Sequence, residues 1–182
     1  IGKIPKDLLK YTKIIQVPMS KIQYSAYKKN YHGVIDINIE KIMNFCLPGD
    51  RFDLDDMSHD EHKELGITST SSHMYGKRYT GSILEYKNLS KYSAKYHKCF
   101  ENMLKNPRGN VLIFLKYVQN SGSKLFSSIL FENGILDYGS NVISYRTRHY
   151  QTYETYYDWK KSGKKSNDFI PAKYVLFFDK MS

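Results

Sequence analysis

The stretch Val111-Leu112-Ile113-Phe114-Leu115 is a run of five apolar residues between a turn at 107–110 and Lys116. Continuous apolar runs of this length are typical of strands that are buried on both faces of a parallel sheet. We therefore expect a buried strand at 111–115.

A helix and a second strand follow this run. Residues 125–131 carry apolar side chains at helical spacing, and Asn133-Gly134 ends the predicted helix as a C-cap. The apolar run at 172–179 predicts another buried strand. Strand, helix and strand make a βαβ unit with a right-handed crossover, so the predicted fold class is α/β. The long connection before the last strand indicates an insertion near residues 140–168.

The beginning of the chain predicts a strand and a capped helix. Residues 14–17 are mostly β-branched and apolar, and Pro18 ends the predicted strand. Ser20 and Gln23 then have the spacing of a capping box, which predicts a helix to about Asn30.

A second helix is predicted at 90–106, after a polar segment. Residues 48–82 combine a turn, an acidic run and a Ser/Thr tract, which indicates a loop or a loose insertion. Ser90 is expected to cap the second helix. The apolar stripe of this helix is Tyr92, Tyr96, Cys99, Phe100, Met103 and Leu104.

The composition favours a polyanionic partner. The 182 residues carry 28 Lys and Arg against 18 Asp and Glu, a formal net charge of +10. Nucleic acid is favoured over a membrane surface, because no Lys-rich amphipathic helix with bulky apolar residues stands out. No apolar run is long enough to span a bilayer. A biased genome that is rich in Lys and Tyr codons is the alternative explanation of the charge.

The cysteines and the first residue indicate an intracellular segment. Cys46 and Cys99 lack the spacing of a metal site, and reduced thiols are the favoured interpretation over a single disulfide. The chain starts with Ile1 and shows no signal peptide, so we expect a piece of a longer polypeptide.

Motifs for nucleotide hydrolysis are not present in the sequence. Gly-Lys pairs occur at 2–3, 76–77 and 163–164, but none is followed by Ser or Thr or placed between a strand and a helix. Asp60-Glu61-His62 superficially resembles a helicase acidic box, without the buried strand that should precede it. His59 and His62 are competent metal ligands, but a solvated acidic loop is the favoured interpretation. No catalytic, cofactor-binding or metal-binding residue is predicted.

Two segments are candidates for contact with nucleic acid. Residues 150–165 interleave Tyr with Lys, which suits single-stranded nucleic acid, although Tyr150, Tyr153 and Tyr157 also have the spacing of a packed helix. Packing is the favoured interpretation there. The loop at 121–123 opens the predicted helix directly after the predicted strand, where amides and hydroxyls suit a phosphate. N-capping by either Ser explains the same loop. The predicted nucleic-acid-binding residues are Lys116, Ser121, Gly122, Ser123 and Lys124.

Two segments resemble one protein family. Residues 17–27, from Val17-Pro18-Met19-Ser20 to Tyr27, resemble the segment that leads into the second RecA-like domain of Snf2-like superfamily 2 helicases. Residues 108–134 resemble helicase motif IV and its following helix. The small residues and spacing in 120–134 look most like the helicases of large nucleocytoplasmic DNA viruses, including the small subunit of the poxvirus-type early transcription factor. Leu115 and Lys116 depart from the Ser or Asn that commonly follows the motif IV Phe.

The resemblance implies a partial RecA-like parallel sheet with flanking helices, preceded by a helical linker or insertion. The implied divisions are a linker at 1–47, an acidic and polar loop or insertion at 48–89, and the first half of the second RecA-like domain at 90–182. The parent protein would be an ATP-dependent helicase or translocase that uses ATP and Mg²⁺ and is linked to viral transcription. This segment would contact the nucleic-acid backbone without hydrolysing ATP, because the chain lacks the phosphate loop, metal carboxylates and arginine finger.

The same resemblance implies partners and a location. The expected partners are DNA or RNA, the remainder of the helicase polypeptide and a viral RNA polymerase, with no membrane. The expected location is intracellular, in the cytoplasm of an infected cell or in the virion. One alternative is a non-enzymatic, basic nucleic-acid-binding or adaptor module that uses the Tyr/Lys segment as its surface. A further alternative is a secreted domain with one disulfide.

Overall fold

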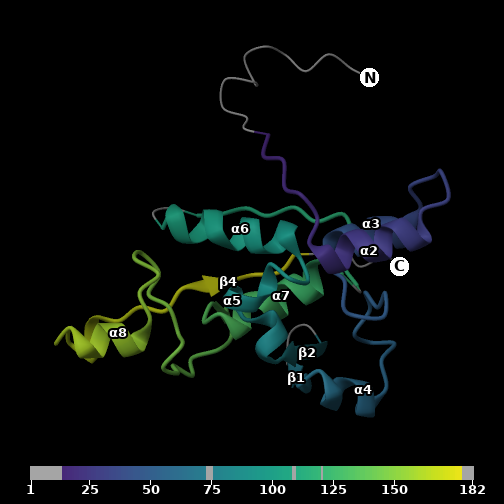
Figure 1. Ribbon diagram of the computed structural model, residues 1–182. Coiled ribbons are helices and arrows are strands. Elements are labelled where there is room, and N and C mark those ends of the chain that lie inside the picture. Colours follow the sequence, from purple (N-terminus) through teal and green to yellow (C-terminus); the bar gives the residue numbers. More distant parts are fainter. Residues whose placement is uncertain (1–13, 73–75, 108–109, 120, 178–182) are drawn as a thin grey trace.

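The computed structural model describes residues 14–72, 76–107, 110–119 and 121–177, and shows a mixed α/β protein (Figure 1). The α-helices of the described part are α2 (Lys21–Asn30), α3 (Ile37–Asn44), α4 (His59–Glu64), α5 (Tyr86–Leu89), α6 (Ala94–Lys105), α7 (Ser123–Glu132) and α8 (Tyr156–Lys161). The strands are β1 (Thr68–Ser72), β2 (Gly76–Thr80), β3 (Leu136–Asp137) and β4 (Lys173–Tyr174). The strands form two separate two-stranded sheets, so the α/β class is confirmed while a RecA-like sheet is not.

The main core lies between α6, α7 and the antiparallel hairpin β1–β2. The rings of Tyr96 on α6 and Phe126 on α7 are 4.9 Å apart, and Ser128 on α7 accepts a hydrogen bond from the Tyr79 amide on β2. The fully buried members of this core are Phe45, Leu47, Leu84, Leu89, Tyr96, Phe100 and Ile129. In Figure 1, α6 lies along one side of the molecule, and α8 lies at the opposite end from α2 and α3.

The capping box predicted for the first helix is confirmed. The Ser20 hydroxyl accepts from the Gln23 amide at 3.2 Å, and the Gln23 side chain accepts from the Ser20 amide at 3.3 Å. The helix ends at Asn30, as expected. Residues 14–20 form no regular structure, so the strand predicted at 14–17 is wrong.

Gln23 also ties three helices together. Its side-chain amide donates to the carbonyl oxygens of Ile42 at 3.0 Å and Met43 at 2.9 Å, at the end of α3. Its carbonyl oxygen accepts from the amide of Ala94, the first residue of α6, at 3.1 Å. Gln23 is almost fully buried, so these bonds are made in a poorly solvated environment, where unpaired partners are costly.

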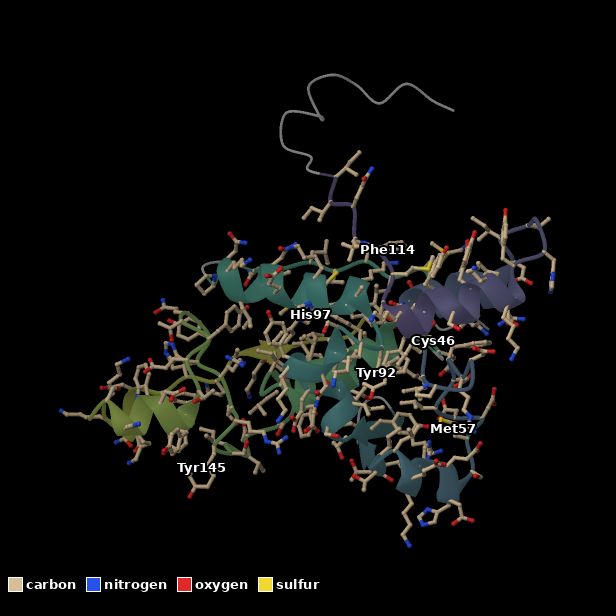
Figure 2. The ribbon with its side chains drawn as sticks, viewed as in Figure 1. Cys46, Met57, Tyr92, His97, Phe114 and Tyr145 are labelled. Carbon is tan, nitrogen blue, oxygen red and sulfur yellow. The ribbon has the colours of Figure 1, made fainter. Side chains whose placement is uncertain are left out.

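Residues 111–115 are extended but form no strand, which corrects the prediction on which the expected sheet depended. Ile113 and Leu115 pack against the core, whereas Leu112 and Phe114 are 93% and 90% exposed. This alternation has the two-residue period of a strand. No backbone group of 110–116 is hydrogen-bonded to another described residue, so the ladder that defines a strand is missing. Figure 2 shows Phe114 at the surface beside α6.

The parallel pairing that the structure does contain follows α7. Helix α7 ends at Glu132, and Gly134 adopts φ of +85° with its α-carbon packed against the Arg146 carbonyl, so the predicted C-cap is confirmed. The chain then enters β3, which pairs in parallel with β4 through Leu136↔Lys173 and Asp137↔Tyr174. Of the second strand predicted at 172–179, only 173–174 is a strand, and 178–179 lie outside the described residues.

The second predicted helix is shorter than expected, and the predicted loop is largely structured. The helix expected at 90–106 begins at Ala94, where Ser93 rather than Ser90 caps it, and α5 precedes it as a separate turn. Residues 48–82 contain α4 and the β1–β2 hairpin and supply Leu54, Ile67 and Tyr79 to the main core. Their sequence looks loop-like because β1, TSTSS, is largely exposed and carries no apolar residue.

Residues 140–172, which we call the C-terminal lobe, include the segment 140–168 that was predicted to be an insertion, and they contain an aromatic cluster. His149 stacks on Trp159 with ring centroids 4.6 Å apart, and Phe169 contacts both rings. Packing of aromatic residues, the favoured interpretation of this segment, is therefore present. The helical stripe of Tyr150, Tyr153 and Tyr157 is not, because α8 begins only at Tyr156. Among the described helices, none has the length and apolar character needed to cross a membrane.

Replacing Gln23 with Ala is expected to destabilise the fold by about 3 kcal/mol, because it leaves two carbonyls at the end of α3 and the amides of Ser20 and Ala94 without their partner. The measurement is the free energy of unfolding in urea. Gln16→Ala, at an exposed position before α2, is the matched control and should change stability by less than about 0.5 kcal/mol. Equal effects of the two substitutions would contradict the role given to Gln23.

Both cysteines are expected to be free thiols that differ in reactivity. Burial raises the pKa of Cys46 to about 12 and also raises the pKa of the half-buried Cys99. Because the thiolate is the reactive form, a disulfide reagent at neutral pH should modify Cys99 slowly and Cys46 only after unfolding. Two equivalents of thiol in denaturant, without reductant, are expected. A count of zero would show a disulfide instead.

Candidate nucleic-acid interface

The loop before α7 is held by hydrogen bonds to the first amides of that helix. The amides of Gly122, Ser123 and Lys124 donate to the carbonyl oxygens of Gln119, Tyr117 and Val118, at 2.9, 2.8 and 3.0 Å. No side chain of a described residue caps the helix. The three amides that were predicted to face a phosphate therefore already have carbonyl partners within the loop.

Gly122 is required by the close packing of this loop. A β-carbon at this position would lie 2.1 Å from the Tyr117 carbonyl oxygen, so any side chain would push the loop away from the helix. Gly122 thus permits the loop closure.

Ser121 lies in the interior rather than at the surface. Its residue is fully buried, and its carbonyl accepts a hydrogen bond from the Tyr96 hydroxyl on α6. Burial raises the pKa of Tyr96, which keeps that hydroxyl protonated as a donor. The Ser121 hydroxyl has no hydrogen-bond partner among the described residues. Ser123 is half-buried. The two serines predicted to face nucleic acid are thus placed mainly by packing.

Lys116 is exposed but already paired with an acid. Its ammonium lies 2.9 and 2.7 Å from the two carboxylate oxygens of Glu40 on α3, and the Tyr117 hydroxyl donates to the same carboxylate. Hydrogen bonds from Lys116 and Tyr117 lower the pKa of Glu40, so it is ionised at neutral pH. Two donors that converge on one carboxylate form the kind of arrangement that also binds a phosphate oxygen.

Lys124 lines a cavity of about 130 Å³ beside the start of α7. No acidic side chain of the described residues lies within ion-pair distance of the Lys124 ammonium. Lys77 and Tyr79 on β2 share the cavity and both interact with Asp55, Lys77 at 3.7 Å and Tyr79 by a hydrogen bond. Asp53 lines the other side, and burial raises the pKa of its carboxyl. A cation without a paired acid therefore faces this small polar cavity.

The five predicted residues thus divide into two cations, of which Lys116 is exposed and Lys124 half-buried, and three residues of the loop. Lys116 and Lys124 flank the loop that Ser121, Gly122 and Ser123 help to close. Sequence reasoning missed Glu40 and Lys77, because α3 and β2 reach the loop only through tertiary packing. Residues 77–98 carry six Lys and Arg against one Glu, and this positive charge is the one sequence signal for Lys77.

The residues of the other candidate sites make structural contacts or lie in an unsuitable setting. The His62 imidazole is buried and hydrogen-bonded through Nε2 to the Leu54 carbonyl at 2.8 Å, on helix α4 rather than after a strand. Within the ranges that the structure describes, no group of three His, Cys, Asp or Glu residues is arranged to hold a metal ion. Gly76-Lys77 begins β2 and Gly163-Lys164 follows α8, so neither pair has the strand-to-helix setting of a phosphate loop.

Glu40→Gln is expected to strengthen nucleic-acid binding about two- to fivefold, because it releases Lys116 from its competing carboxylate. The measurement is the dissociation constant for a fluorescein-labelled oligonucleotide by anisotropy. Glu64→Gln on α4 changes the net charge equally without touching Lys116, and should have a smaller effect. Equal gains from both substitutions would mean that only net charge matters.

Comparisons with models of protein families, with curated proteins and with solved structures give no match for this chain. The helicase resemblance therefore rests on the residues quoted for it in the sequence, and the functions that it implies are proposals.

Proposed function

We propose that this chain belongs to the second RecA-like domain of a superfamily 2 helicase of the kind found in large DNA viruses, where it contacts the nucleic-acid backbone. The observation that carries the proposal is that Lys124, at the start of α7, has no acidic partner among the described residues. That helix follows an extended apolar segment and leads into a parallel strand pair, an order of elements that agrees with motif IV and its helix. Lys116, on the other side of the loop, adds a second cation.

The helicase-like segment at 17–27 has a clear structural role that fits this proposal. Its Ser20 and Gln23 form the capping box, and Gln23 joins α2 to α3 and α6. Helix α3 in turn carries Glu40, which contacts Lys116 and Tyr117 at the entrance to the candidate interface. The two segments that resemble the family are thus connected through one chain of contacts.

ATP and Mg²⁺ would be bound by other residues of the parent protein. The described residues of this chain form neither a phosphate loop nor a group of metal-ligating side chains. The contribution proposed for this chain is therefore electrostatic. Its lysines would bind phosphates and release counterions, and hydrolysis would depend on residues elsewhere in the helicase, with the viral transcription machinery as the proposed setting.

A non-enzymatic basic module that binds nucleic acid is the second candidate. The exposed ring of Tyr157 beside lysines on α8 favours it. The sequence of the surrounding reading frame separates the two candidates. A Gly-Lys-Thr loop upstream of Ile1 together with Gln-x-x-Gly-Arg downstream of Ser182 is expected for a helicase, and their absence from the full frame would favour the module.

Lys124→Gln is expected to weaken binding to an oligonucleotide and to reduce the slope of log affinity against log salt by about 0.7 to 0.9, the value of one phosphate contact. The readout is anisotropy over a series of salt concentrations. Lys63→Gln, at an exposed position on α4, is the control with the same change in charge. Ser121→Ala should leave binding unchanged because that side chain is buried. A Lys124→Gln slope equal to that of the Lys63→Gln control would overturn the proposal.

A further inference from the structure

The aromatic residues of the C-terminal lobe fall into two groups. The inner group, His149, Tyr156, Trp159 and Phe169, makes ring-to-ring contacts within the lobe. The Trp159 indole also donates to the Lys165 carbonyl at 2.9 Å, which closes the turn after α8. These rings and bonds are sufficient to hold the lobe together. Tyr145 and Tyr157 take no part in them.

Tyr145 and Tyr157 are neighbours on the outer surface. Tyr145 is 76% exposed and Tyr157 is 55% exposed. The Tyr157 amide donates to the Tyr145 carbonyl at 3.2 Å, so the two residues are held side by side at the first turn of α8. Neither ring has an aromatic contact within the described part of the chain. Figure 2 shows the Tyr145 side chain directed away from the body of the protein.

Two lysines lie on the same face of α8 as Tyr157. Lys160 and Lys161 follow it by three and four residues, the spacing that places helical side chains next to one another. Lys161 has no acidic partner among the described residues, and Lys160 contacts only the Ser166 hydroxyl, at 2.9 Å. The acid of this helix, Asp158, is turned to the Thr155 hydroxyl at its N-cap, 2.6 Å away.

The other lysines of the lobe have structural roles. Lys164 forms an ion pair with Glu154 at 2.6 Å and lies 4.5 Å from the centre of the Trp159 ring. Lys165 supplies the carbonyl that holds the Trp159 indole. The ammonium of Lys165 is not used in that bond, and the cations that lie beside Tyr157 on α8 are Lys160 and Lys161. We call Tyr145, Tyr157, Lys160 and Lys161 the tyrosine–lysine patch.

We propose that the tyrosine–lysine patch binds single-stranded nucleic acid, with the two tyrosine rings stacking on bases and the two lysines contacting the adjacent phosphates. Stacking needs unpaired bases, because a duplex covers both faces of each base within its own stack. The two exposed rings belong to residues that are joined by a backbone hydrogen bond, so both can contact bases of one strand. The arrangement contains no donor or acceptor set that reads a base edge, so binding is independent of sequence.

This site is separate from Lys124 and rests on the proposed function only in sharing nucleic acid as the ligand. The test is the binding of labelled oligo(dT) and oligo(U), with a duplex of equal length for comparison. Tyr145→Ala and Tyr157→Ala are each expected to weaken binding to the single strands about tenfold, with little effect on the duplex. Phe at either position should preserve binding, because stacking does not use the hydroxyl.

Tyr24→Ala is the matched control. Tyr24 also lies on a helix, is 55% exposed and has a lysine close to its ring. Among the described residues, it has no second exposed ring held beside it. Trp159, the one tryptophan of the sequence, reports whether the lobe stays folded, and its emission should be unchanged in the variants. Lys161→Gln should reduce the salt slope for single strands, while the tyrosine variants should leave it unchanged.

Two outcomes would overturn the patch. In one, the double substitution Tyr145→Ala/Tyr157→Ala binds oligo(dT) as the Tyr24→Ala control does, with normal Trp159 emission. In the other, single strand and duplex weaken equally, which would assign the loss to general charge or to a protein surface. Because Lys124→Gln is measured separately, results that contradict the patch do not contradict the proposed backbone contact at α7. Results that contradict the contact at α7 likewise do not contradict the patch.

Discussion

The buried side chain of Gln23 is the constraint on which the arrangement of the N-terminal half depends. One amide group accepts from Ser20 and Ala94 and donates to the end of α3, so three helices share a single small polar centre. A polar group with this many partners tolerates little displacement, because each lost bond leaves a buried group unpaired. The position of α3 then fixes Glu40, and Glu40 determines how Lys116 and Tyr117 lie before α7.

Local signals in the sequence predicted the parts of the structure that depend on local interactions. The capping box at Ser20 and Gln23, the extent of α2 and α7, and the glycine cap at Gly134 each involve residues close together in the chain. The prediction of a strand at 111–115 was wrong for the opposite reason. An apolar run shows that its side chains favour burial, but a strand also needs a neighbouring backbone, which no single segment can specify.

In the candidate site, too, some features depend on single residues and others depend on tertiary packing. The sequence showed that Lys116 and Lys124 flank the loop, because charge can be read residue by residue. It could not show that the loop carbonyls would occupy the amides of α7, or that Ser121 would be buried beneath Tyr96. Those facts depend on how the loop closes on the helix, and that closure depends on contacts with α6. In the lobe, likewise, only the structure separates the packed rings from the exposed ones.

The extended segment 110–116 also affects how the protein behaves in concentrated solution. Its outward side chains are apolar and its backbone groups are unpaired with other described residues, so two molecules that meet along it can pair as strands. The net charge of +10 opposes such encounters by mutual repulsion. Added salt screens that repulsion, just as it weakens contacts between lysines and phosphates. Colloidal stability and affinity for nucleic acid are therefore coupled through the same lysines, and both decline as ionic strength rises.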